Sequence, residues 1–166
     1  MKKNKFLGLI AVPFIVILAF ILIKSFTLTT GTDILLETAP IDPVDLFRGN
    51  YVALSYVIST VNLETTPHDK EFIEKETIYA LLSQKDEFWT IDKVSHKKPQ
   101  VQQNQVCMKG KVTSSWRENQ VRVEWGIESF FLPTDQAKKV EREREDAKAG
   151  ITVDSRCASV LKALEI

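Results

Sequence analysis

Few of the residues that build active sites and metal centres occur in this chain. Its 166 residues include two histidines and two cysteines, and they contain no CxxC pair, HExxH, GxSxG or glycine-rich phosphate loop. His68 and His96 lie in polar segments without a ligand or nucleophile pattern around them, which predicts solvated surface residues. The sequence therefore identifies no catalytic residue, no metal site and no cofactor site.

Acidic residues are absent from the first 24 positions, and residues 6–23 carry no charge of either sign. A helix of this apolar run spans roughly 27 Å, close to the ~30 Å hydrocarbon thickness of a bilayer. A cleaved signal peptide has a shorter apolar region, about 7–15 residues, followed by a small-residue cleavage site. Here Lys24-Ser25-Phe26 follows the run directly, so we predict an uncleaved transmembrane anchor over residues 6–24.

The basic residues around this run predict its orientation. Lys2, Lys3 and Lys5 precede the run, whereas Lys24 alone follows it closely. This bias favours an N-terminus on the cytoplasmic side. No second apolar run approaches this length. We therefore expect one crossing of the cytoplasmic (inner) membrane, with residues 1–5 inside and one domain of residues 25–166 outside, in the periplasm.

The balanced formal charge hides an asymmetry between anchor and domain. Four of the 22 basic residues flank the anchor, which leaves 18 basic and 22 acidic residues outside, a net charge of −4. A mildly acidic domain lacks the clustered lysine and arginine that nucleic acid requires. The same charge argues against peripheral binding of anionic lipid, so we expect membrane contact through the helix and no nucleic-acid partner.

The outer residues predict a mainly β domain with α+β character and a late surface helix. That helix would begin at Thr134 or Asp135 and run to about Lys148, with Gly150 as its terminator. Residues 51–59 are apolar on both alternating faces, which predicts one covered, central strand, and residues 60–76 predict an irregular excursion. The other expected strands span residues 34–38, 77–82, 88–94, 104–113, 120–127, 130–132, 151–153 and 158–164.

Cys107 and Cys157 lie in segments that we expect to form strands. Outside the cytoplasm two such thiols can form a disulfide, but a small buried cysteine is also ordinary in a strand. Sequence spacing cannot place their Cα atoms within the ~7 Å that a bridge requires. Both alternatives, a disulfide and two separate core thiols, remain open at this stage.

A turn-to-strand segment, PIDPVDLFRGNYVALSY at residues 40–56, resembles the signature of the GDYXXLXY protein family. Members are bacterial proteins named for Gly-Asp-Tyr-x-x-Leu-x-Tyr, and Asn50 stands where that pattern has aspartate. The matching residues are Gly49, Tyr51, Leu54 and Tyr56, preceded by a Pro-x-Asp-Pro-x-Asp-Leu segment and an arginine that supply Asp42, Pro43, Asp45 and Arg48.

A second patch, WGIESFFLP at residues 125–133, is similar to the later aromatic-Gly-Ile-Glu segment of the same family and contains Gly126 and Glu128. Thr134 follows it where the family pattern has an acid. The resemblance implies a membrane-anchored protein, often encoded beside polytopic membrane proteins, and it supplies no catalytic residue. We therefore treat both patches as motif residues with a possible interaction role.

Two interpretations of the motif remain open. In the structural one, Gly49 and Asn50 turn the chain into a strand on which Tyr51, Leu54 and Tyr56 pack. In the functional one, an arginine and tyrosine rim engages a partner.

We expect a non-enzymatic accessory protein that docks its outer domain on polytopic membrane partners. An anchored hydrolase with a serine–lysine pair and a small-ligand sensor are the alternatives.

Overall fold

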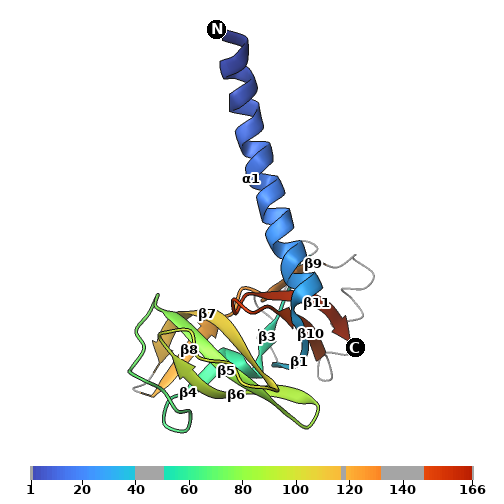
Figure 1. Ribbon diagram of the computed structural model, residues 1–166. Helices are drawn as coiled ribbons and strands as arrows, with labels where there is room; N and C mark the ends of the chain where they lie inside the picture. The colour runs from blue at the N-terminus through green and yellow to red at the C-terminus, as the bar shows by residue number, and fades with distance from the viewer. Residues whose placement is uncertain (1, 40–50, 117–118, 132–147, 166) are drawn as a thin grey trace.

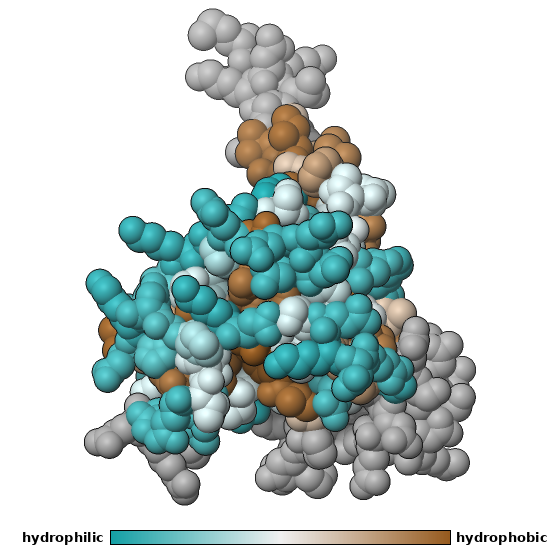
Figure 2. Space-filling view, turned by 60° about the horizontal axis from the view of Figure 1, so that its bottom comes forward, coloured by the Kyte–Doolittle hydropathy of each residue, from teal (hydrophilic) through white to brown (hydrophobic). Residues whose placement is uncertain are grey.

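A computed structural model describes residues 2–39, 51–116, 119–131 and 148–165. It consists of one long helix, α1 (Lys2–Thr30), projecting from a mainly β domain (Figure 1). The segment Ala11–Thr30 is long and apolar enough to cross a membrane. Figure 2 shows its apolar side chains standing clear of a domain whose visible surface is largely polar. The mainly β class that the sequence predicts is present, together with an N-terminal apolar helix typical of a membrane anchor or signal sequence.

The domain contains two larger antiparallel sheets and one short strand pair. The first sheet has the order β11–β10–β1–β3, and the second has the order β4–β8–β7–β5–β6. Among the described strands, β2 pairs with β9 alone. The strands are β1 (Thr32–Ala39), β2 (Tyr51–Ala53), β3 (Ser55–Tyr56), β4 (Thr60–Asn62), β5 (Thr77–Lys85), β6 (Phe88–Ser95), β7 (Gln105–Trp116), β8 (Gln120–Glu124), β9 (Ser129–Phe131), β10 (Lys148–Val153) and β11 (Ser159–Glu165).

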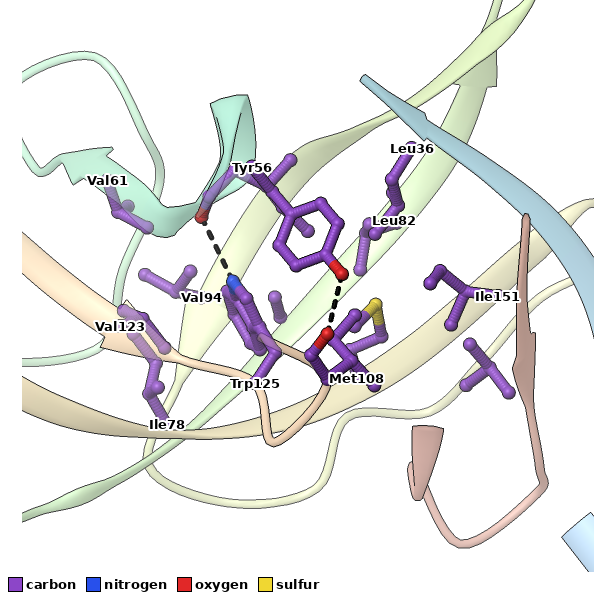
Figure 3. Packing of buried hydrophobic residues seen from close by; sticks show 14 of the residues in the cluster. Leu36, Tyr56, Val61, Ile78, Leu82, Val94, Met108, Val123, Trp125 and Ile151 are labelled. Carbon is purple, nitrogen blue, oxygen red and sulfur yellow. Dashed lines mark hydrogen bonds between the residues drawn. The ribbon is translucent and has the colours of Figure 1, made fainter. Parts of the chain in front are cut away.

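The core lies where the two larger sheets face each other. Leu36 of β1 and Ile151 of β10 approach Leu82 of β5 and Met108 of β7 around the ring of Tyr56 (Figure 3). These five side chains are almost completely buried. Alternation explains this packing, because every second residue of a strand faces the same side. Each fully buried aliphatic side chain contributes about 1.5–3 kcal/mol to folding.

The segment 51–59 is not the single central strand that its apolar pattern predicts. It divides into β2, β3 and a 3₁₀ turn, η2 (Val57–Ser59). Strand β3 lies at the edge of its sheet, and the side chain of Val57 is 51% exposed. The pairing with β9 continues through Leu54, whose N–H donates to the Glu128 carbonyl at 2.7 Å, and the chain then enters β3, which pairs with β1 instead.

Two further boundaries differ from the sequence prediction. Gly150 does not terminate a helix, because Lys148–Val153 forms β10, with β1 on one side and β11 on the other. Alternate burial of Ala149, Ile151 and Val153 against the core favours this strand. The excursion at 60–76 begins with β4, which pairs with β8. The predicted helix itself, from Thr134 onward, falls on residues 132–147, outside the described part of the chain.

Candidate functional site

The structure describes only part of the family motif. Leu54, Tyr56, Gly126 and Glu128 are described with their side chains, and Tyr51 is described through its backbone pairing. The remaining predicted motif residues lie outside the described ranges, and these are Asp42, Pro43, Asp45, Arg48, Gly49 and Asn50.

The two motif patches, about 75 residues apart in sequence, lie side by side in the fold. Tyr51, Val52 and Ala53 of β2 pair with Phe131, Phe130 and Ser129 of β9. The same register continues by one residue, since the Leu54 N–H donates to the Glu128 carbonyl. The first patch therefore pairs with the second through their backbones.

Tyr56, the last residue of the naming motif, is 1% exposed. Its hydroxyl donates to the Ile127 carbonyl at 2.7 Å, as Figure 3 shows. Burial raises the pKa of the Tyr56 phenol above its ordinary value, and the nearby Glu128 carboxylate raises it further. The phenol is thus a neutral structural donor that joins the two patches.

The turn at residues 125–128 carries the Ile127 carbonyl that accepts the Tyr56 hydroxyl. Gly126 has a φ of +78° and is exposed, a backbone conformation that glycine adopts without strain. The Glu128 carboxylate accepts the Trp125 N–H. The Trp125 indole donates to the Ile58 carbonyl at 3.3 Å, and Ser159 Oγ donates to the Trp125 carbonyl at 3.2 Å. The described motif residues therefore support the structural interpretation.

A second constellation joins α1 to the domain. Thr27 Oγ1 donates to Asp154 Oδ2 at 2.9 Å, and both side chains are buried. Asp154 also accepts Arg156 Nε at 3.0 Å, Arg156 Nη2 at 2.7 Å and the Ala158 N–H at 3.0 Å. Burial raises the pKa of Asp154, but these hydrogen bonds outweigh burial and hold it below its ordinary value.

Gly31 is the only residue between α1 and β1. A Cβ atom at this position would lie 2.6 Å from Thr152 Cγ2, 2.7 Å from the Thr27 carbonyl and 2.8 Å from the Val153 carbonyl. Two of these neighbours are backbone atoms that cannot rotate away, so the helix end fits against β10 only because residue 31 has no side chain. We call Thr27, Gly31, Asp154 and Arg156 the anchor junction.

Cys107 of β7 and Cys157 form a disulfide with a Cα–Cα distance of 4.8 Å, which settles the alternative that the sequence left open. Cys157 belongs to the loop between β10 and β11 that also carries Asp154 and Arg156. The Lys109 N–H donates to the Cys157 carbonyl at 2.9 Å. The disulfide therefore fixes the loop of the anchor junction to the five-stranded sheet.

His96 is not the solvated residue that the sequence predicts, because its side chain is 25% exposed and bonded on both nitrogens. Nδ1 lies 2.8 Å from Asp69 Oδ1, and Nε2 lies 3.3 Å from Glu76 Oε2. Its ring stacks on buried Phe72 with a centroid distance of 4.0 Å. Sequence reasoning missed this cluster because Asp69 and His96 are 27 residues apart without a motif.

These contacts do not assemble a recognisable reaction centre. Within the described ranges, no group of three or more histidine, cysteine, aspartate or glutamate side chains could hold a metal ion. A lysine and a serine do approach each other, since Lys98 Nζ donates to Ser155 at 2.6 Å. The acceptor, however, is the Ser155 backbone carbonyl, so this contact gives the serine hydroxyl no base.

An apolar helix that continues into a disulfide-linked, mainly β domain defines a class of protein with a single-pass membrane anchor or signal sequence at its N-terminus. Within this class the chain belongs to the GDYXXLXY protein family, whose model matches residues 13–164. The resemblance of residues 40–56 and 125–133 to that family is thereby confirmed. No curated protein and no solved structure matches the chain.

Proposed function

We propose that the chain is a single-pass accessory protein of the cytoplasmic membrane that holds its β domain outside the cytoplasm and docks on polytopic membrane proteins. The observation that carries this proposal is the anchor junction. Thr27 bonds Asp154, and Gly31 alone links α1 to β1, so no flexible linker separates anchor and domain. A domain fixed in this way presents one constant face to its neighbours in the membrane plane.

The exposed side chains of α1 suit a protein whose helix lies among lipids and other helices. Phe14 is 68% exposed and Phe20 is 66% exposed, and they lie on a helix whose described contacts with the domain are near its C-terminal end (Figure 1). Large exposed apolar surfaces mark contact with a membrane or with partners. This surface is available both to lipid and to transmembrane helices of a partner.

The disulfide supports the proposed orientation. Disulfides persist in oxidising compartments and are rare in the cytosol, and the Cys107–Cys157 bond lies inside the β domain. The three lysines before the apolar run favour the same topology through the positive-inside rule. Both observations agree with a domain outside the cytoplasm.

In-membrane photocrosslinking tests the docking. We expect a photoreactive phenylalanine analogue at position 20 to give discrete adducts with a polytopic membrane protein, identified by mass spectrometry. Adducts with lipid alone, together with a monomeric, partner-free protein after mild solubilisation, would contradict the proposal. Protease treatment tests the orientation, with cells whose cytoplasmic membrane is intact compared with permeabilised cells. The protease must be able to reach the outer face of that membrane, and a β domain that is still protected in the intact cells would overturn the proposed orientation.

The variant Gly31→Ala tests whether docking requires the fixed geometry. We expect it to open the junction at a cost of about 1–3 kcal/mol and to weaken the position-20 adducts. Gly150→Ala is the matched control, because its Cβ would lie 3.7 Å from the nearest atom, the Ala163 carbonyl oxygen, an ordinary contact. Equal adduct yields in the two variants would show that a rigid junction is not needed.

A further inference from the structure

The face of the domain that touches α1 lies close to the bilayer surface. The apolar run ends at Ile23, and the first side-chain bond to the domain comes from Thr27. Four residues of helix rise ~6 Å, and the polar headgroup layer on each side of a bilayer is about 5–7 Å thick. With α1 spanning the membrane as proposed above, this face lies within the headgroup layer, and a tilt of α1 brings one side of it closer still.

Two loops of the described chain lie on this face. One is Asp154–Ala158 between β10 and β11, and its Arg156 guanidinium lies 5.3 Å from the centre of the Phe26 ring on α1. The other follows β6 and carries Lys98, which donates to the Ser155 carbonyl of the first loop. Between them is a hollow of about 670 Å³ that is lined by residues of both loops and by Thr30 at the end of α1.

Within the described residues, both cations keep donors that their protein contacts do not use. The Arg156 side chain is 51% exposed, and only Nε and Nη2 bond Asp154, so the Nη1 donors lie outside this ion pair. Lys98 is exposed and uses one of its three donors on the Ser155 carbonyl. Guanidinium and ammonium groups bind phosphate oxygens through charge-assisted hydrogen bonds.

The acidic net charge of the domain does not describe this face. The buried Asp154 carboxylate is offset by Arg156. Exposed Lys97 and Lys98, in the other loop of this face, add positive charge. The net charge of the domain predicts membrane contact through the helix alone. That net charge does not say where on the domain the basic side chains lie, so it does not exclude a basic patch beside the helix.

We propose that Arg156 and Lys98 bind the phosphate oxygens of lipid headgroups and hold the β domain against the leaflet from which α1 emerges. This inference rests on the proposed membrane anchorage, but it needs no protein partner. The helix inserts the chain into the bilayer. The Arg156 and Lys98 side chains set the distance of the β domain from the bilayer surface and its tilt relative to that surface. The hollow between the loops has room for the headgroup atoms attached to such a phosphate.

The test uses the full-length chain in phospholipid nanodiscs that contain a lipid with a nitroxide on its phosphocholine headgroup. We expect amide NMR signals of residues 97, 98, 100, 101 and 154–158 to broaden strongly, whereas those of the β5–β6 turn, at the end of the domain away from α1 (Figure 1), stay sharp. Lys98→Gln should reduce the broadening, and Lys98→Gln with Arg156→Gln should reduce it further. Lys85→Gln in that distant turn is the charge-matched control.

Unchanged broadening in the double variant, or sharp signals from both loops in the wild-type chain, would overturn the proposal. The single variant leaves the Asp154–Arg156 pair intact, so it separates lost lipid binding from a disturbed loop. Signals of core amides such as Ile78 and Val94 report whether each variant is folded. A chain that fails to enter nanodiscs would contradict the anchorage itself, a result distinct from insertion without headgroup contact.

Discussion

At the scale of single residues, the Tyr56 hydroxyl gives the last motif residue of this chain a structural role. A phenylalanine would fill the same apolar space, but it could not donate to the Ile127 carbonyl. That carbonyl belongs to the second patch and lies 71 residues away in sequence. The hydroxyl therefore fixes the position of one patch on the other, in addition to the apolar packing of the ring.

We expect Tyr56→Phe to lower the free energy of unfolding by about 1–3 kcal/mol, because the buried Ile127 carbonyl loses its hydrogen-bond donor. Urea unfolding in detergent micelles, followed by tryptophan fluorescence, measures the change. Tyr79→Phe is the control, since Tyr79 lies half-buried on β5 and retains its ring in that variant. Equal losses in the two variants would show that the hydroxyl of Tyr56 has no special role.

The sequence predicts some of these residues and not others. Alternation of apolar residues places Leu54 and Tyr56 on one inward face, and both are buried. The partners of Tyr56 and Trp125 could not be predicted, because each bond joins segments about 70 residues apart in the chain. Register between β2 and β9, which decides these contacts, is a property of the folded sheet and is not encoded in either patch alone.

At the scale of elements, the connection between β4 and β5 is held in place by the His96 cluster. Phe72 is buried beneath the imidazole, and the Asp69 and Glu76 carboxylates bond its two nitrogens. The Val94 N–H donates to the Pro67 carbonyl at 2.9 Å, which adds a backbone bond to β6. A segment that reads as irregular in sequence is therefore fixed to the sheet at several points.

This cluster predicts a pH dependence. Burial lowers the pKa of His96, but the hydrogen bonds to Asp69 and Glu76 outweigh it and raise that pKa above its ordinary value. Burial raises the pKa of Asp69, whereas the bonds from His96 outweigh it and lower that pKa to about 2. The stabilisation is therefore complete between about pH 4 and pH 6.5, and it is lost as pH rises through the folded pKa of His96 or falls toward 2.

We expect the melting temperature of the wild-type chain to fall more between pH 6 and pH 8 than that of His96→Gln. The variant lacks the imidazole whose loss of a proton weakens the cluster. The effect is no more than about 1 kcal/mol, since Asp69 is partly exposed and solvent screens the pair. His68→Gln serves as the control, because the described bond of His68 is to the Thr66 carbonyl. Parallel melting curves for wild type and His96→Gln at both pH values would refute the prediction.

Element prediction succeeded where an apolar pattern was long and local. Strands β5 and β6 lie close to their predicted ranges, and the apolar run of residues 6–23 lies within α1, because each of these patterns extends over many residues. The assignment of Gly150 failed because the charged residues before it favour a helix, while pairing with β1 and β11 decides the structure. Strand propensity depends on the neighbours in the sheet more than on the residue itself.

At the scale of the whole molecule, the disulfide links the two larger sheets. It connects β7 of the five-stranded sheet to the loop after β10 of the four-stranded sheet. That loop also bonds the end of α1 through Asp154. The disulfide thus joins the two larger sheets covalently, and the hydrogen bond from Thr27 to Asp154 adds the end of α1 to this connection.

We expect Cys107→Ala with Cys157→Ala to lower the free energy of unfolding by about 2–4 kcal/mol, because the bond closes a loop of 50 residues in the unfolded chain. Urea unfolding with and without reductant measures the loss, and the reduced wild-type chain should match the oxidised double variant. Reductant should leave the double variant unchanged. If the double variant had the same unfolding midpoint as the oxidised wild-type chain, the prediction would be wrong.

The direct passage from Thr30 through Gly31 into β1 has a mechanical consequence. With Gly31 alone between them, α1 and β1 have no free chain that would let them turn independently. If α1 spans the membrane as proposed, a neighbouring helix that rotates α1 about its axis also rotates the β domain. The proposed docking would thereby set the direction in which the polar surface of the domain faces.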